Sequence, residues 1–291
     1  MLGLNIQLLV AGLSVGSIYA LVALGLVMTY KASDVLNFAQ GEILTAGAYI
    51  ALLFSVTLKF PYYQSFFLTI ILISGLGILL ERVAFRPLIM APPFTIIIAT
   101  LAVGQMIKNL IRLIWQSDVH RLSPPFRMAI WKWQDIRVNT QAVWVIACAL
   151  IITGILAVFF RSSWLGKAMR SVSQNQQGAR LMGISVERVF SLTWAISAAL
   201  GAAAGILIAP LIGVYPDMGL VLVKAFVASI IGGFTSLAGA VVGGLVVGLI
   251  ETFSGAYISS TFKEFVAFIL LIVLLMFRPY GLFGAKQARR V

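Results

Sequence analysis

The chain has 291 residues, of which 61% are hydrophobic and only 10% are charged, whereas about 25% are charged in a typical soluble domain. This composition excludes a soluble globular protein, because so little polar surface cannot cover so much apolar side chain. The formal net charge of +12 would suggest nucleic acid in a soluble protein, but basic loops that orient a membrane protein explain it better. With one cysteine and one histidine, disulfides and Cys/His metal sites are excluded.

A membrane-spanning helix needs about 20 mainly apolar residues. We therefore predict an all-α integral membrane protein, one transmembrane domain over residues 1–291, with about nine (8–10) transmembrane helices. The apolar stretches are 5–30, 36–57, 64–81, 94–115, 141–160, 189–212, 219–233, 237–254 and 265–278. The first lacks the basic start and cleavage site of a signal peptide, so it is kept as a helix. The glycine-rich segment 219–254 is expected either as two simple spans or as broken or re-entrant helices.

The basic residues between these stretches predict the orientation. If the polar segment 161–188 is cytoplasmic, twelve basic residues lie on the cytoplasmic side and six on the other. The twelve are Lys31, Arg82, Arg86, Arg161, Lys167, Arg170, Arg180, Arg188, Arg278, Lys286, Arg289 and Arg290, and the six are Lys59, Arg121, Arg127, Lys132, Arg137 and Lys263. We therefore predict a cytoplasmic C-terminus and an N-terminus on the outer side.

A polar hexapeptide, residues 37–42, begins the second apolar stretch and contains Asn37, Gln40 and Glu42. Such side chains are costly at membrane depth unless they face protein or water. One interpretation is a helix N-terminus at the cytoplasmic interface, with Glu42 near the positive end of the helix dipole. The other is that the segment lines the inner end of a translocation path.

Three further charges stand at or inside apolar stretches. Lys224 and Glu251 lie toward the outer ends of adjacent predicted helices, where they can form a buried ion pair or face a substrate. Glu81 is expected at an interfacial, charged helix end beside Arg82.

The segment 161–188 is a polar interruption long enough for a short helix along the membrane surface. Basic residues dominate its polar side, and its apolar residues recur near helical spacing. Anionic lipid binds such a helix, and so does the groove of a partner protein. The residue pattern alone leaves both interpretations open.

Sequence motifs of catalysis are missing from the chain. It has no G-x-x-x-x-G-K-[ST], no H-E-x-x-H and no G-x-S-x-G, so a P-loop, a zincin site and a nucleophile elbow are excluded. Its buried acidic residues are too few for a proton relay. Energy for transport must therefore come from elsewhere, or the protein is passive.

Small residues recur at four-residue spacing, which lets helix backbones approach closely in lipid. These pairs are Gly12/Gly16, Gly201/Gly205, Gly239/Gly243 and Gly244/Gly248.

Several ordered motifs make the chain resemble the LivH-type permease subunit of bacterial ABC importers for branched-chain amino acids, over essentially its whole length. The motifs are GLSVGSIYAL at 12–21, NFAQGE at 37–42, GKAMR at 166–170, ARLMGI at 179–184, IGG at 231–233, GAVVGG at 239–244 and FRPYGLFG at 277–284. The resemblance implies an ABC importer permease fold in the bacterial inner (cytoplasmic) membrane, with a periplasmic N-terminus.

The resemblance also implies partners and roles. It implies a second related permease in a heterodimer, two cytoplasmic ATP-binding subunits and a periplasmic solute-binding protein, and no cofactor of the chain's own, because the partners bind ATP. The segment 161–188 then becomes a cytoplasmic coupling loop. The resemblance gives ATPase coupling to Gly166, Arg170, Ala179, Arg180 and Gly183, and a place on the translocation path to Tyr19, Asn37, Gln40 and Glu42. The alternatives are a self-sufficient secondary transporter or channel for a small polar solute, and a lipid-modifying membrane enzyme.

Overall fold

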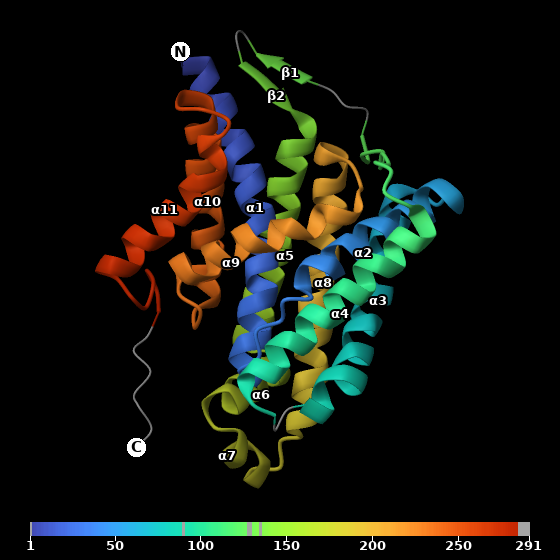
Figure 1. Ribbon diagram of the computed structural model, residues 1–291, viewed down its shortest axis with the longest axis vertical. Helices are drawn as coiled ribbons and strands as arrows, with labels where there is room; N and C mark the ends of the chain where they lie inside the picture. The colour runs from blue at the N-terminus through green and yellow to red at the C-terminus, as the bar shows by residue number, and fades with distance from the viewer. Residues whose placement is uncertain (1, 89–90, 127–129, 134–135, 285–291) are drawn as a thin grey trace.

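The computed structural model describes residues 2–88, 91–126, 130–133 and 136–284, and these residues form a bundle of helices (Figure 1). The α-helices are α1 Leu2–Ser33, α2 Gln40–Leu52, α3 Tyr62–Leu80, α4 Pro93–Trp115, α5 Thr140–Ser162, α6 Trp164–Gln174, α7 Gln176–Leu181, α8 Val186–Ile212, α9 Val221–Gly232, α10 Leu237–Tyr257 and α11 Phe262–Phe277. Short π- and 3₁₀-helical turns are η1 Leu53–Thr57, η2 Glu81–Phe85, η3 Arg86–Leu88 and η4 Pro216–Leu220. An antiparallel hairpin, β1 Ile130–Trp133 and β2 Ile136–Asn139, is an addition to the predicted all-helical fold.

Six helical segments of the described residues are long and apolar enough to cross a membrane: 3–33, 62–88, 93–115, 140–162, 186–212 and 237–257. They match six of the nine predicted stretches. The stretches 36–57, 219–233 and 265–278 form the shorter elements α2 with η1, α9 and α11. At 1.5 Å per residue the 12 residues of α9 extend about 18 Å, well short of the ~30 Å hydrocarbon core. Segment 219–254 is therefore not two simple spans.

Helices α1 and α8 form the centre of the bundle (Figure 1). Within their most apolar windows 78% and 72% of the residues are buried, compared with 11% in α5. Helices α2 and α3 pack against α8, and α9, α10 and α5 pack against α1. The outer faces of α3, α4 and α5 remain apolar and exposed, as expected of surfaces that meet lipid.

Glycines allow the closest helix contacts in this centre, as their spacing predicts. A Cβ at Gly248 of α10 would lie 2.3 Å from Cα of Gly16 in α1, and one at Gly205 of α8 would lie 2.2 Å from the Leu44 carbonyl oxygen of α2. Real side chains do not come so close to backbone atoms. Glycine is therefore required wherever these backbones touch.

The motif at 277–284 closes the bundle beside α9. The N–H groups of Leu282 and Phe283 donate to the carbonyl oxygens of Ile231 (2.8 Å) and Gly232 (3.0 Å), and these are two of the last carbonyls of α9. Gly281 has φ +76, a conformation that glycine adopts without strain. The C-terminal motif thus satisfies the buried end of a helix that stops inside the bundle.

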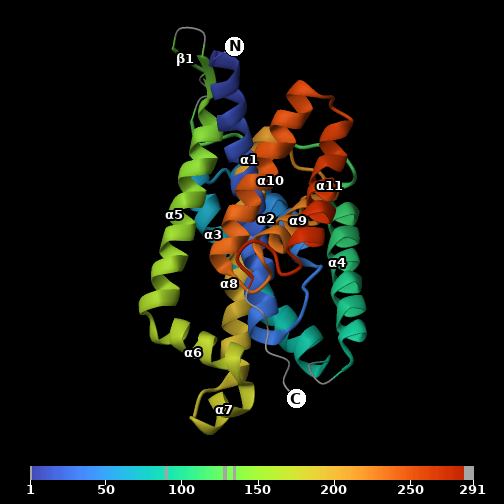
Figure 2. The same cartoon turned by 90° about the vertical axis from the view of Figure 1, so that its left-hand side faces the viewer.

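The long axis of the molecule separates two ends. The N-terminus and the β-hairpin lie at one end, and α6 and α7 project from the other (Figures 1 and 2). Four basic residues used to predict the orientation, Arg127, Lys286, Arg289 and Arg290, lie outside the described residues.

Candidate functional site

The α6–α7 segment, residues 163–185, is a compact unit built from its own caps. The Ser163 side chain accepts a hydrogen bond from the Gly166 N–H (2.9 Å), and the Asn175 side chain accepts one from the Gly178 N–H (2.9 Å). Both are N-cap interactions that define where a helix begins. The polar run at residues 174–177 is thus the junction between the two helices.

Three residues assigned to coupling hold this segment against the bundle. A Cβ at Gly166 would lie 2.6 Å from the Phe160 carbonyl oxygen, so α6 touches the end of α5. The Arg170 guanidinium donates to the same carbonyl oxygen. Ala179 is 4% exposed and packs inward from α7. Within this chain these three residues fix the position of the segment, and other side chains form its outer surface.

The tip of the α6–α7 segment is apolar and exposed. Leu181 and Met182 are 89% and 83% exposed and precede Gly183, which ends α7 with φ +78 in a left-handed C-cap conformation. Arg180 pairs with Glu187 at the start of α8 (2.9 Å). Two neighbouring large apolar side chains held in the open are suited to burial in another protein.

Gln40 ties three helices together at the start of α2. Its Nε2 donates to the Ser197 carbonyl oxygen in α8 (2.8 Å), and its Oε1 accepts from the Ser197 hydroxyl (3.0 Å). Its amide fills a notch where Cβ atoms at Gly25 and Gly201 would lie 2.5 and 2.9 Å away. Asn37 Nδ2 also donates to Gln40 Oε1, at 3.4 Å. Both Asn37 and Gln40 are buried, 1% and 0% exposed, so their amides face protein here.

Glu42 lies two residues further along α2, beside a second group of charges. Its carboxylate approaches Gly219 of η4, where a Cβ would lie 2.6 Å from Oε1. Nearby, Asp217 of η4 accepts from Arg112 of α4 (3.1 Å) and forms an ion pair with Lys108, and all three charges act electrostatically on Glu42. One carboxylate oxygen of Glu42 is buried without a hydrogen-bond partner among the described residues.

Tyr19 belongs to a different cluster from Asn37, Gln40 and Glu42. Its hydroxyl donates to Glu251 Oε2 (2.8 Å), and Lys224 Nζ donates to Glu251 Oε1 (2.6 Å). Glu264 and Lys263 of α11 extend the cluster, at 3.2 Å from Lys224 and 3.7 Å from Glu251. Glu251 is 1% exposed, so α1, α9, α10 and α11 meet around one buried carboxylate.

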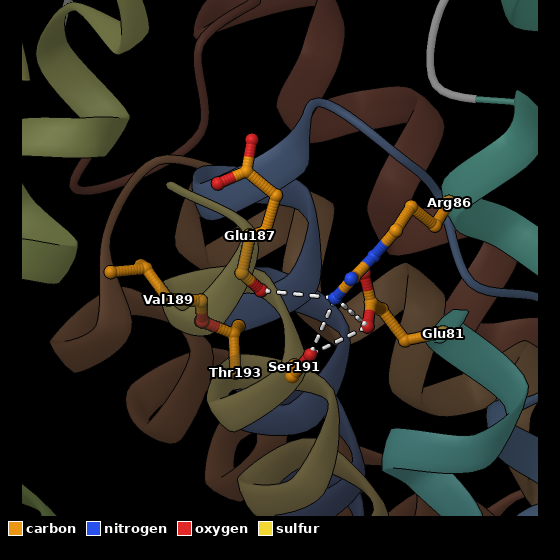
Figure 3. Close-up of polar contacts among 6 residues, drawn as sticks. All are labelled: Glu81, Arg86, Glu187, Val189, Ser191 and Thr193. Carbon is orange, nitrogen blue, oxygen red and sulfur yellow. Dashed lines mark hydrogen bonds and ion pairs between the residues drawn. The ribbon is translucent and has the colours of Figure 1, made fainter. Parts of the chain in front are cut away.

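Glu81 lies at the end of α3 next to Arg82, as predicted, but it is buried, at 2% exposed, and pairs with Arg86. Arg86 donates to both Glu81 oxygens (2.9 and 2.8 Å), to the Ser191 hydroxyl oxygen (2.8 Å) and to the Glu187 carbonyl oxygen (3.3 Å). Ser191 in turn donates to Glu81 (2.6 Å), as Figure 3 shows. This network joins η2 and η3 to the first turns of α8.

Comparison with known proteins decides the family. The sequence matches the family described as "Branched-chain amino acid transport system / permease component" over residues 8–275. The chain belongs to this permease family. Its curated relatives include the high-affinity branched-chain amino acid transport system permease proteins LivH of Salmonella typhimurium (31% identical, 98% of this chain and 97% of the relative) and BraD of Pseudomonas aeruginosa (32%, 98% of each). A probable LivH of Methanocaldococcus jannaschii is 28% identical over 94% of this chain and 92% of the relative.

The permease contains candidate residues that the sequence analysis did not select. Lys108 and Arg112 fall inside the apolar stretch 94–115 and are not among the basic residues counted for the orientation, yet they hold Asp217 beside Glu42. Two cations four residues apart share a helix face, and charges in such a helix require a partner. The four-residue spacing of Lys108 and Arg112 is therefore the sequence feature that could have identified them as candidates. No sequence pattern identifies Leu181 and Met182 as candidates, because their exposure depends on how α7 ends.

We expect Lys224→Met to destabilise the permease by about 1–3 kcal/mol, because the buried Glu251 carboxylate loses its shortest charge-assisted hydrogen bond. Tyr19→Phe, which removes a single neutral donor, should cost less, about 1 kcal/mol. Thermal unfolding of the purified full-length chain, followed by size-exclusion chromatography after heating, measures both. Equal losses in the two variants would contradict a carboxylate held mainly by the lysine.

Proposed function

We propose that this permease forms half of the translocation path of an ATP-driven importer for branched-chain or closely related amino acids. A second related permease in a heterodimer, two cytoplasmic ATP-binding subunits and a periplasmic solute-binding protein complete the assembly. The permease itself binds no cofactor, because ATP is bound by the partners. The observation that carries the proposal is the projecting α6–α7 segment with its exposed Leu181 and Met182, which offers an apolar contact to an ATP-binding subunit.

The charged side chains around Glu42 support a location for the translocation path, between α2, α4 and η4. Glu42, Lys108, Arg112 and Asp217 bring two acidic and two basic side chains together between α2, α4 and η4. An amino acid zwitterion carries both charges, and balanced polar groups beside apolar walls suit it. In this proposal Asn37 and Gln40 fix the position of the start of α2. Tyr19 fixes the position of Glu251 through its hydrogen bond.

The two ends of the molecule support an orientation. The α6–α7 segment projects from the end opposite the N-terminus (Figure 2) and carries Lys167, Arg170 and Arg180, so we place that end in the cytoplasm. The N-terminus and the hairpin then face the periplasm, and the C-terminus lies in the cytoplasm. In this arrangement the six long spans are joined by α2, α9 and α11 as shorter embedded helices, which gives nine membrane segments.

Replacing Leu181 and Met182 together with serine should abolish coupling while the fold persists, because both side chains are exposed. We expect leucine uptake by proteoliposomes that contain the whole complex to fall at least tenfold, since burial of two such side chains contributes about 1.5–3 kcal/mol each. Val119→Ser, at an exposed apolar residue of the opposite end, is the matched control and should keep normal uptake.

The alternative function makes the opposite prediction. A self-sufficient secondary transporter would take up leucine when this chain alone is reconstituted and an ion gradient is applied. The importer proposal predicts no uptake under those conditions, and uptake only with ATP inside, both ATP-binding subunits present and the loaded binding protein outside. Gradient-driven uptake by the isolated chain would exclude the proposal.

A further inference from the structure

A small cavity is lined by residues of α6, of the last turns of α1 and α5, of the first turns of α8 and of the start of α10. Its volume is about 90 Å³, whereas one water needs ~10–15 Å³ on this measure. The cavity therefore has room for a group of several atoms. Lys31 and Arg170 supply positive charge to its wall, and Met28, Phe160, Met169 and Leu237 supply apolar surface.

Among the described residues, the two cations of this cavity form no ion pair with an acidic side chain. Ion pairs elsewhere in the described residues join Glu81, Asp217, Glu187, Glu251 and Glu264 to other bases, and none includes Lys31 or Arg170. Both side chains line the same cavity, so their positive charges repel each other. Two like charges brought together without an acid favour an anion between them.

The hydrogen-bond capacity of Arg170 leads to the same conclusion. A guanidinium has five N–H donors, and within the described part of the chain Arg170 makes one hydrogen bond, from Nη1 to the Phe160 carbonyl oxygen at the end of α5. That bond fixes the side chain in the cavity wall and leaves other donors available. The Lys31 ammonium adds three donors. An oxyanion with several acceptor oxygens suits this set.

We propose that this cavity binds the phosphate group of an anionic phospholipid. Lys31 lies in the last turn of α1, at the end of a membrane span, which is the depth of lipid headgroups. The apolar part of the wall matches the glycerol and first methylenes of such a lipid, and basic pockets between membrane helices bind anionic headgroups. A free phosphate ion shares the charge but gains nothing from the apolar wall.

The bound lipid would connect α1, a central helix of the bundle, with α6, the first helix of the α6–α7 segment. Its phosphate cancels the repulsion between Lys31 and Arg170 and thereby holds α6 against α1. The binding itself does not depend on the proposed transport function. It concerns only this chain and the membrane around it.

The test titrates phosphatidylglycerol or phosphatidylcholine into the purified full-length chain in detergent and follows thermal stability. Phosphatidylglycerol should stabilise the chain, and phosphatidylcholine should not. Lys31→Gln should weaken the apparent affinity for phosphatidylglycerol at least tenfold, as expected for a charge-assisted hydrogen bond. The matched control is Lys167→Gln, an exposed lysine of α6 outside the cavity, which loses only general surface attraction and should weaken it no more than about fivefold.

Each other result counts against the proposal. Equal effects of the two substitutions would mean that the lipid acts by general surface charge, and no preference between the two lipids would mean that no anion site exists. If inorganic phosphate alone produces the full stabilisation and competes with phosphatidylglycerol, the ligand is a free anion. Native mass spectrometry of the unmodified chain, with phosphatidylglycerol retained at one copy and phosphatidylcholine lost, decides between the lipids even if Lys31→Gln does not fold.

Discussion

Replacing Arg86 with methionine is expected to destabilise the permease by about 3–5 kcal/mol, because it leaves a buried carboxylate without its cation. Glu81 is 2% exposed and receives both of its guanidinium hydrogen bonds from Arg86. Of the hydrogen bonds that the described residues make to Glu81, the variant keeps the one from the Ser191 hydroxyl (Figure 3), which does not balance a full negative charge. The purified chain should lose its monodisperse peak at a much lower temperature than the unmodified protein.

Two further variants separate the charge effect from lost packing. Arg82→Met changes an exposed arginine of η2 that has no ion pair among the described residues, so it should shift stability by no more than about 0.5 kcal/mol. Glu81→Met combined with Arg86→Met removes both charges, and apolar replacement of both partners around a buried charge is often nearly neutral. A double variant as unstable as Arg86→Met alone would contradict this explanation.

The same network has a consequence for the α6–α7 segment. Arg86 donates to the carbonyl oxygen of Glu187, and the Glu187 side chain accepts from Arg180 of α7 (2.9 Å). The start of α8 is thus held by η3 on one side and by the α6–α7 segment on the other. A displacement of this segment by a partner would act first on the N-terminal turns of a central helix.

Much of the fold could be predicted from local patterns. Spans 64–81, 94–115, 141–160 and 189–212 were predicted because continuous apolar length is a property of the sequence alone. The short, glycine-rich stretch 219–233 was expected either as a simple span or as a broken or re-entrant helix, and it forms the short helix α9. Close helix packing at Gly16 and Gly248 followed from their spacing.

Partners across long sequence distances could not be predicted in the same way. Tyr19 bonds to Glu251, 232 residues away, and Gln40 bonds to Ser197, 157 residues away. A motif shows that polar residues need partners, but the path of the chain decides which partner each one meets. The pair of Glu81 and Arg86 could not be predicted either, although only five residues separate them. Their alignment depends on a π-helical turn, which the sequence pattern does not reveal.

The substitution Gly248→Ala adds one methyl group and is expected to destabilise the permease by at least about 1–3 kcal/mol through overpacking. The added Cβ would lie 2.3 Å from both Cα and N of Gly16. These are backbone atoms of α1, so no side chain can turn aside to make room. Helix α10 would have to move away from the central helix along the whole contact, which also disturbs Glu251 on the same helix.

The same substitution at Gly154 of α5 is the matched control, because no atom lies within 4 Å of a Cβ built there. Alanine is the better helix former by about 1 kcal/mol, so Gly154→Ala should leave thermal stability unchanged or raise it, while Gly248→Ala lowers it. Heating the two purified variants side by side measures this difference in sign directly. If both variants melted at the temperature of the unmodified chain, the contact between α1 and α10 would be looser than the structure describes, and the pairing of glycines would not hold the bundle together.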